Sequence, residues 1–175
     1  EAVFVDLMNQ YAQQLGMTSS HFENSPGMPG PQHYVTARDI GILAAALVRD
    51  FPQYYKWYSQ REFTWNKITQ QNRNGLLDRD PTIDGLKTGH TQSAGYCLVS
   101  SGNRDGMRVI SVVMGAPSIR AREDASLALL NYGFRFYETK QLFAAHQPVL
   151  SARVWKGEAN QVELAPNRDV FVTIP

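Results

Sequence analysis

Three apolar segments between residues 82 and 115 constrain the fold most strongly. TIDGLKTG, AGYCLVSS and MRVISVVMG are rich in β-branched and apolar residues and are short enough to be strands. Turn-forming residues separate them, HTQS in the first gap and GNRDG in the second. The pattern predicts an antiparallel meander of three strands.

Helical spacing of apolar residues predicts helices before and after this meander. The first runs from residue 1 to Gly16, a residue suited to ending a helix. The second follows Thr36, which together with Asp39 resembles a capping box. The third follows Ser118 as its cap. For the first two helices, the simplest interpretation of the apolar face is core packing.

The remaining segments indicate more strands. Residues 62–69 are strand-like and are followed by a turn at Asn72–Gly75. Beyond about Lys140 the chain reads as short strands with turn breaks. We therefore expect an α/β (α+β) fold: residues 1–138 as a domain with a central antiparallel sheet flanked by helices, and residues 139–175 as part of a small β-rich domain.

Composition limits the classes of partner and cofactor. Seventeen Lys and Arg against sixteen Asp and Glu leave a net charge of +1, which predicts neither nucleic acid nor an anionic membrane as the main partner. Cys97 is the single cysteine, so no internal disulfide is possible. The four histidines are scattered without metal-ligand spacing. We expect neither a metal nor a cofactor.

The triplet Lys87-Thr88-Gly89 is the first feature with a chemical implication. Alone it is a weak signal, but here it lies on an expected strand and is followed by HTQSAGY. Lysine suits proton transfer because its pKa moves readily when the amine is desolvated. Threonine offers a hydroxyl donor, and glycine lets an extended ligand approach the strand edge closely.

Several longer segments extend this signal over nearly the whole chain: YVTARD, NRNGLL, DGLKTGHTQSAGYCLV, RVISVVMGA and LLNYGFRFYE. Together they resemble the low-molecular-mass penicillin-binding proteins, serine-type D-alanyl-D-alanine carboxypeptidases. The resemblance covers the later part of the catalytic domain and the start of the C-terminal β domain. It implies a β-lactamase/transpeptidase-like fold.

The resemblance also implies roles for particular residues. Lys87 is the implied catalytic residue, and Lys87, Thr88, Gly89 and Arg122 are the implied substrate-binding residues. The backbone N–H of His90 is implied as half of the oxyanion hole. Its imidazole is more simply a wall of the cleft. A guanidinium at Arg122 suits the free carboxylate of a C-terminal D-alanine.

Other candidate residues carry less weight. Arg73 matches a further family arginine near the cleft, although an arginine in a turn needs no special role. Arg120 lies two positions before Arg122 and cannot share its helix face. The triplet Ser101-Gly102-Asn103 imitates a family site element, but it follows Lys-Thr-Gly in the chain where the family order places it before. We interpret it as a hairpin turn.

The chain contains no candidate nucleophile. No serine is followed three residues later by lysine. Thr64-Trp65-Asn66-Lys67 imitates this spacing, but a strand places its two side chains on opposite faces. The helical pattern at residue 1 and the unfinished β unit at Pro175 lead us to expect a fragment that is inactive alone.

The expected activity of the complete protein is removal of the terminal D-alanine from peptidoglycan stem peptides, with β-lactams as covalent inhibitors. The resemblance implies a periplasmic protein, held at the inner membrane by a C-terminal anchor that is absent from these residues. A class A-like β-lactamase is one alternative, although residues Ser25 to Gln32 contain no acidic side chain for deacylation. A non-catalytic peptidoglycan-binding module is the other.

Overall fold

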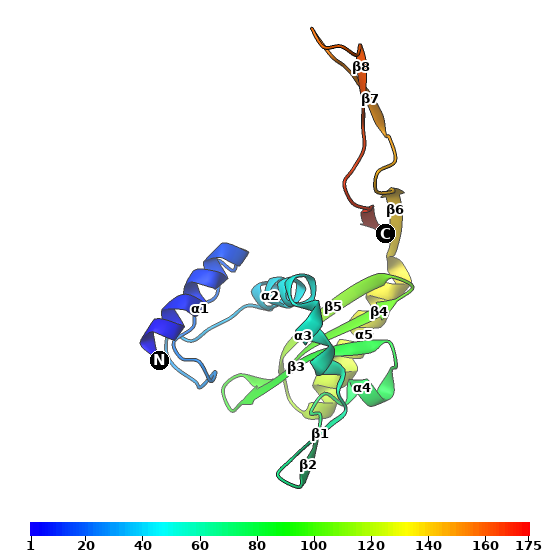
Figure 1. The fold of residues 1–175 in the computed structure, drawn as a ribbon. Coiled ribbons are helices and arrows are strands. Elements are labelled where there is room, and N and C mark those ends of the chain that lie inside the picture. The colour runs from blue at the N-terminus through cyan, green and yellow to red at the C-terminus, as the bar shows by residue number, and fades with distance from the viewer. The chain divides into compact units, whose positions relative to one another are not determined.

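The computed structural model describes the whole chain, Glu1–Pro175. The chain divides into two compact units, Glu1–Gly133 and Phe134–Pro175. Figure 1 labels the elements along the chain. The first unit contains most of the helices and a three-stranded sheet, and the second contains two short antiparallel strand pairs.

The central sheet of the first unit consists of β3 (Ile83–Thr91), β4 (Gly95–Arg104) and β5 (Met107–Ala116) in the order β3-β4-β5. Both strand pairs are antiparallel, which confirms the expected meander. The second turn is tighter than expected because only Asp105 and Gly106, both with positive φ, connect β4 to β5.

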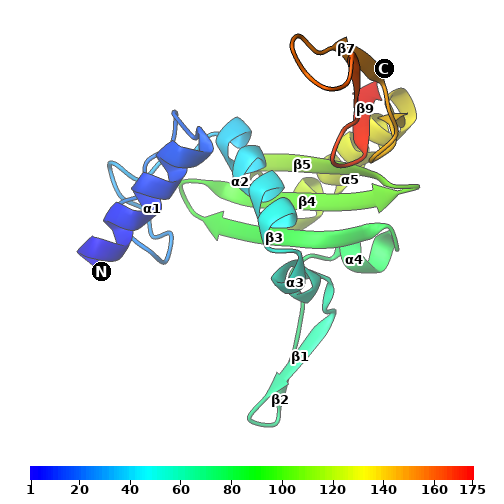
Figure 2. The ribbon, with the colours of Figure 1, turned by 45° about the horizontal axis from the view of Figure 1, so that its top comes forward.

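Two helices cover the two faces of this sheet (Figure 2). α2 (Ala37–Asp50) packs on one face, where Gly41 lies against the Val112 side chain. α5 (Ile119–Phe136) lies on the other, where Gly133 comes so close to Val109 that an added Cβ would be 2.8 Å from a valine methyl. The expected fold class, an antiparallel sheet flanked by helices, is confirmed.

Both expected helix caps are present. The Asp39 backbone N–H donates to the Thr36 hydroxyl at 3.1 Å, and the Ala121 N–H donates to the Ser118 hydroxyl at 3.1 Å. Asp39 is itself buried, and its carboxylate accepts from the Ser20 hydroxyl at 2.7 Å. This bond ties the loop before α2 to the start of that helix. None of the helices combines the length and the apolarity that crossing a bilayer requires.

α1 (Ala2–Leu15) ends at Gly16, whose φ of 84° is the left-handed conformation that glycine adopts without strain. The boundaries are as expected, but the expected burial of the apolar face is wrong. Val3, Phe4 and Tyr11 are exposed, and Ala12 is the buried residue of this helix. The reason is that no element of the chain packs over that face of α1, so core packing of this helix is not realised within these residues.

Short elements connect α2 to the sheet: α3 (Pro52–Tyr55), η1 (Lys56–Ser59), β1 (Glu62–Trp65), β2 (Ile68–Gln71) and α4 (Leu76–Arg79). Residues 62–69 are strand-like, as expected, but they belong to two strands rather than one. Asn66 and Lys67, with φ of 47° and 63°, form a two-residue turn, so the segment folds into a hairpin.

A polar cluster holds the start of β3 against α3 and β5. The Arg108 guanidinium makes two 2.8 Å bonds to the Asp84 carboxylate and a 2.7 Å bond to the Ser101 hydroxyl. The Tyr55 hydroxyl donates to Asp84 at 2.7 Å. Burial, above all, raises the pKa of Tyr55, and the bond to Asp84 raises the pKa of Arg108. This cluster fixes the strand that carries Lys87.

The second unit contains β6 (Glu138–Phe143) paired with β9 (Val170–Ile174), and β7 (Leu150–Arg153) paired with β8 (Gln161–Leu164). All four strands are short and mostly exposed, as expected for part of a β-rich domain. The boundary between the two compact units lies after Gly133, near the end of α5. A domain boundary between residues 138 and 139 stays a prediction.

The paired charges of Arg108 and Asp84 are expected to stabilise the first unit. In Arg108→Met, the half-buried Asp84 carboxylate loses its counter-charge and two hydrogen bonds, so the free energy of unfolding should fall by about 2 kcal/mol. Urea unfolding measures the change. Arg49→Met is the matched control, because Arg49 pairs with Asp50 at an exposed site, where ion pairs contribute little. Equal effects in the two variants would contradict this assignment.

Candidate active site

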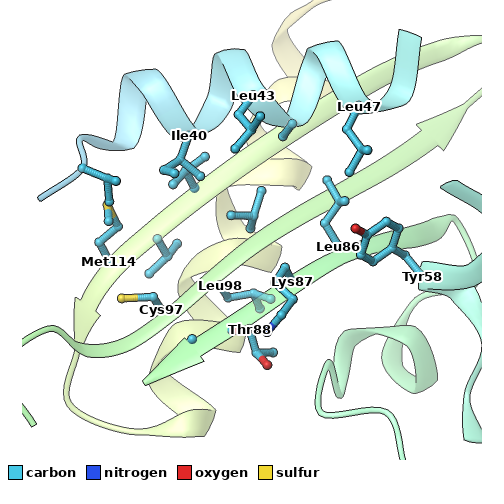
Figure 3. A pocket seen from close by; sticks show the side chains of 16 residues that line it. Ile40, Leu43, Leu47, Tyr58, Leu86, Lys87, Thr88, Cys97, Leu98 and Met114 are labelled. Carbon is cyan, nitrogen blue, oxygen red and sulfur yellow. Dashed lines mark hydrogen bonds between the residues drawn. The ribbon is translucent and has the colours of Figure 1, made fainter. Parts of the chain in front are cut away.

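An apolar cavity of about 330 Å³ lies between α2 and the sheet. Figure 3 shows Ile40, Leu43 and Leu47 of α2 facing the strands across it. The wall residues are predominantly apolar: Val35, Ile40, Leu43, Ala44, Leu47, Tyr58, Leu86, Leu98, Val99, Val112, Val113 and Met114. Lys87, Thr88, Gly89 and Cys97 complete the lining, so the predicted site triplet borders this cavity.

Lys87 is the basic side chain at this border. Desolvation lowers its pKa below the usual 10.5, and the positive charges of Arg73 and Arg122 lower it further. The Lys87 ammonium donates a hydrogen bond to the Thr88 carbonyl oxygen. No carboxylate pairs with it, so its remaining donors are available to a ligand.

Thr88 and Gly89 lie on the edge strand of the sheet. The Thr88 side chain is half-buried, and Figure 3 shows its hydroxyl directed away from α2. Gly89 is exposed and pairs across the sheet with Cys97, where an added Cβ would lie 3.8 Å from the cysteine Cβ. The strand edge therefore has no bulky side chain at Gly89.

The exposed His90 imidazole packs on an aromatic ring. Its centroid lies 4.1 Å from that of Tyr96, its partner across the sheet. The Arg122 guanidinium lies over the same tyrosine ring, 5.9 Å from its centroid. The three side chains form a stack at the end of β3 and β4. This packing gives the imidazole a structural use and supports the interpretation of His90 as a wall.

Arg122 is 4% exposed and contacts three backbone carbonyls. Its Nη1 donates to the carbonyls of Gly89 and Cys97, and its Nη2 donates to that of Arg73, each at 3.3 Å. Its buried Nε has no hydrogen-bond partner. The structure thus brings Arg122 to the predicted site, where it joins β3, β4 and the loop that carries Arg73.

Arg120 and Arg73 differ in their surroundings. Arg120 is exposed and pairs with Asp124 at 3.6 Å, so it does not share the inward face of Arg122. The Arg122 guanidinium donates to the carbonyls of both Arg73 and Gly89, which brings the loop that carries Arg73 to the strand that carries Lys87. Arg73 therefore belongs to the cationic group at the site.

The expected turn at Ser101-Gly102-Asn103 is wrong. All three residues lie in β4 and pair with residues of β5. Ser101 is fully buried, and its hydroxyl accepts the bond from Arg108. The polar residues suggested a turn, but the small, buried Ser101 and Gly102 suit a strand in the middle of the sheet. The triplet is structural, as expected, although for a different reason.

The other imitation of a site element also has a structural explanation. Thr64 lies in β1, and its hydroxyl bonds to that of Thr69 at 2.8 Å across the hairpin. Lys67 lies in the hairpin turn. The chain holds no group of three or more His, Cys, Asp or Glu side chains arranged to bind a metal ion.

Three residues near the site were not expected from the sequence. Asn72 and Asn74 flank Arg73 and are both at least half-buried, which the polar composition of NRNG concealed. Cys97 borders the cavity beside Gly89. Alternation along β4 was the available signal for Cys97, because it shares a face with Val99.

Comparison with known proteins places this geometry in a family. The model of the D-alanyl-D-alanine carboxypeptidase family matches residues 1–118, and the model described as penicillin-binding protein 5, C-terminal domain, matches residues 137–175. The D-alanyl-D-alanine carboxypeptidase DacA of Haemophilus influenzae is 46% identical over 174 residues, which are 98% of this chain and 44% of that protein. The chain thus spans less than half the length of this relative.

Solved structures with a similar fold belong to the same family. Penicillin-binding protein 5 from Haemophilus influenzae superposes with a TM-score of 0.89 at 45% identity, covering 98% of this chain and 51% of that one. Penicillin-binding protein D2 from Listeria monocytogenes, in its cefotaxime-bound form, gives a TM-score of 0.71 at 33% identity over 76% of this chain and 56% of that one. By sequence and by fold, the chain belongs to the D-alanyl-D-alanine carboxypeptidase family of penicillin-binding proteins.

Proposed function

We propose that this chain works as the later part of a serine-type D-Ala-D-Ala carboxypeptidase, which removes the terminal D-alanine from peptidoglycan stem peptides. The observation that carries the proposal is the edge strand with Lys87, Thr88 and Gly89, which borders a cavity. The positive charges of Arg73 and Arg122 add to that of Lys87 there. The nucleophilic serine comes from polypeptide outside these 175 residues, since no Ser-x-x-Lys occurs within them.

The reaction proceeds in two steps. The serine oxygen attacks the carbonyl carbon between the two D-alanines, and the peptide C–N bond breaks as the leaving amine takes up a proton. Water then hydrolyses the resulting ester and regenerates the serine. Lys87 supports the proton transfers, while the His90 backbone N–H and the N–H of the serine stabilise the oxyanion.

Substrate binding uses the free edge of β3. The peptide lies along this edge as an added strand, which the absence of a side chain at Gly89 permits. The Thr88 hydroxyl and the Lys87 ammonium bind the terminal carboxylate. Arg122 contributes its charge from beneath the strand, because its guanidinium is buried against the Gly89 carbonyl. A requirement for this carboxylate makes the enzyme a carboxypeptidase.

β-Lactams are proposed as covalent inhibitors that acylate the same serine. The cefotaxime-bound form of the Listeria protein supports this, because that protein shares the fold of this chain. A β-lactamase as the principal activity is disfavoured, since no residue from Ser25 to Gln32 is acidic and the adjacent Glu23 carboxylate is engaged by the Gln32 backbone N–H. Because the substrate is cell-wall peptide, we place the enzyme in the periplasm, associated with the inner membrane in its complete form.

Two measurements on the complete protein test the proposal. We expect D-alanine release from a peptide ending in D-Ala-D-Ala, and a covalent label from fluorescent penicillin on a serine of a Ser-x-x-Lys segment. The absence of both would leave a non-catalytic wall-binding module. Turnover of a chromogenic cephalosporin much faster than of the peptide would instead identify a β-lactamase.

The lowered pKa of Lys87 predicts the alkaline limb of activity. If the charged ammonium binds the carboxylate, kcat/KM falls as pH rises through the Lys87 pKa, so the limb lies below the usual value of 10.5. Lys87→Arg should lower kcat, because a guanidinium does not release a proton, and should move the alkaline limb of the remaining kcat/KM to higher pH, because the guanidinium stays charged there. Lys87→Ala should lower kcat/KM about 100-fold or more at neutral pH. An unchanged profile in Lys87→Arg would remove Lys87 from the site.

The Thr88 hydroxyl predicts a smaller, selective effect. In Thr88→Val one hydrogen bond to the terminal carboxylate is lost, and kcat/KM should fall about tenfold. Thr88→Ser keeps the hydroxyl and should retain most of the activity. A substrate with an amidated C-terminus is the control, since it should discriminate little between wild type and Thr88→Val. Similar losses with both substrates would show that Thr88 acts through the strand rather than on the carboxylate.

A further inference from the structure

The loop Asn72–Gly75 connects β2 to α4 and carries Arg73 to the site. Arg73 is exposed, yet both of its asparagine neighbours turn inward, and Asn74 is 1% exposed. An exposed cation between two inward-facing amides is unusual for an irregular loop, whose polar side chains normally face water. The amides therefore have partners within the protein.

Asn74 connects this loop to the site strand. Its Nδ2 donates to the Gly85 carbonyl of β3 at 3.0 Å, and its Oδ1 accepts from the Leu76 backbone N–H at 3.3 Å. Its own backbone N–H donates to the Asn72 side-chain oxygen at 2.9 Å. One buried amide thus links β3, the start of α4 and the preceding asparagine.

Asn72 connects the other end of the loop to η1. Its Nδ2 donates to the carbonyls of Gln60 at 2.9 Å and of Tyr58 at 3.2 Å. Its backbone N–H donates to the Arg61 carbonyl at 2.7 Å. The side chains of Asn72 and Asn74 thus fix the backbone before and after Arg73, and the bond from Arg122 fixes the Arg73 carbonyl itself.

This bracing works against electrostatic repulsion. Arg122 donates to the Arg73 carbonyl and to the carbonyl of Gly89, two residues after Lys87, so three like charges come from neighbouring segments, and the two arginines lower the pKa of Lys87. A mobile loop would carry Arg73 away from the other two, because like charges lower their energy by separating. Holding the cations together therefore needs fixed contacts, and neutral amides supply these without adding a charge.

We propose that Asn74, assisted by Asn72, is a positioning residue of the active site that holds Arg73 against Arg122 and against β3, and so concentrates positive charge where the substrate carboxylate binds. Asn74 does not touch the substrate and acts through Arg73. The activity arm of the test rests on the function proposed above, while the titration arm does not.

The titration arm follows the ionisation of Lys87 in the complete protein. Reductive methylation with a ¹³C label keeps the charge of lysines, and loss of a resonance in Lys87→Arg assigns the signal. The other titratable groups around Lys87 are Tyr58 and Cys97, which line the same cavity, and His90 on the same strand. None of them is altered in the variants, so a change in the Lys87 midpoint reports on Arg73.

In Asn74→Ala we expect the Lys87 midpoint to move upward toward 10.5, as it should in Arg73→Met. The matched control is Asn103→Ala, since the Asn103 side chain is exposed and makes no hydrogen bond within the chain. This variant should leave the midpoint unchanged.

The activity arm separates positioning from a merely structural role. Asn74→Ala should lower kcat/KM for a free-carboxylate peptide about tenfold, mainly through KM, because the charge that attracts the carboxylate is displaced. In an Arg73→Met background, Asn74→Ala should cost little more, because the group that it positions is already gone. Asn72→Ala provides a second, milder variant if Asn74→Ala does not fold.

Two results would overturn the proposal. One is a Lys87 midpoint that does not move in folded Asn74→Ala and Asn72→Ala proteins. The other is a loss of kcat/KM that is as large in the Arg73→Met background as in wild type. If the complete protein neither releases D-alanine nor binds penicillin, the carboxypeptidase assignment fails, and the Lys87 titration still decides whether the asparagines position Arg73.

Discussion

The geometry of the site depends on one buried cation. The Arg122 guanidinium is withdrawn from water, a state that costs several kcal/mol unless hydrogen bonds compensate for the lost hydration. Carbonyls of β3, β4 and the Asn72–Gly75 loop provide that compensation. Because these acceptors come from three separate segments, the requirement to solvate one charge fixes the segments relative to each other.

The same arrangement keeps the site electropositive without neutralising it. The carbonyls solvate Arg122 as dipoles, whereas a carboxylate partner would cancel its charge. By contrast, Arg108 is neutralised by Asp84 only a few residues before the site triplet on β3. The two arginines thus show two ways of burying a guanidinium. The paired one stabilises the strand, and the unpaired one leaves a field that favours a negatively charged ligand.

Much of this could be predicted from the sequence. The meander, the helices and their caps follow from periodicity and from local hydrogen-bonding chemistry at Thr36 and Ser118, which act over a few residues. The site triplet was identified by resemblance, and its strand context was correct. The burial of α1 could not be predicted, because periodicity shows which face is apolar but not whether anything covers it.

The errors share a physical origin. The polar triplet at Ser101 was interpreted as a turn, whereas within the sheet the Ser101 hydroxyl accepts from Arg108. The turn at Asn72–Gly75 is present as expected, but the bond from its buried Asn74 to Gly85 was not foreseen. These bonds join residues that are 7 and 11 positions apart, and their geometry exists only after the sheet has formed. Conversely, the two-residue turn at Asn66 and Lys67 was missed because the apolar content on both sides suggested one strand.

The contact between Gly85 and Tyr55 has a consequence for how this sequence can change over time. A Cβ at residue 85 would lie 2.6 Å from the tyrosine hydroxyl oxygen, so position 85 can accept a side chain only if position 55 loses its hydroxyl. That loss would remove a donor from Asp84, which also binds Arg108. A single exchange at either position is therefore disfavoured, and the two positions should covary among descendants of this chain, linking a helix to a strand 30 residues further along in its evolutionary record.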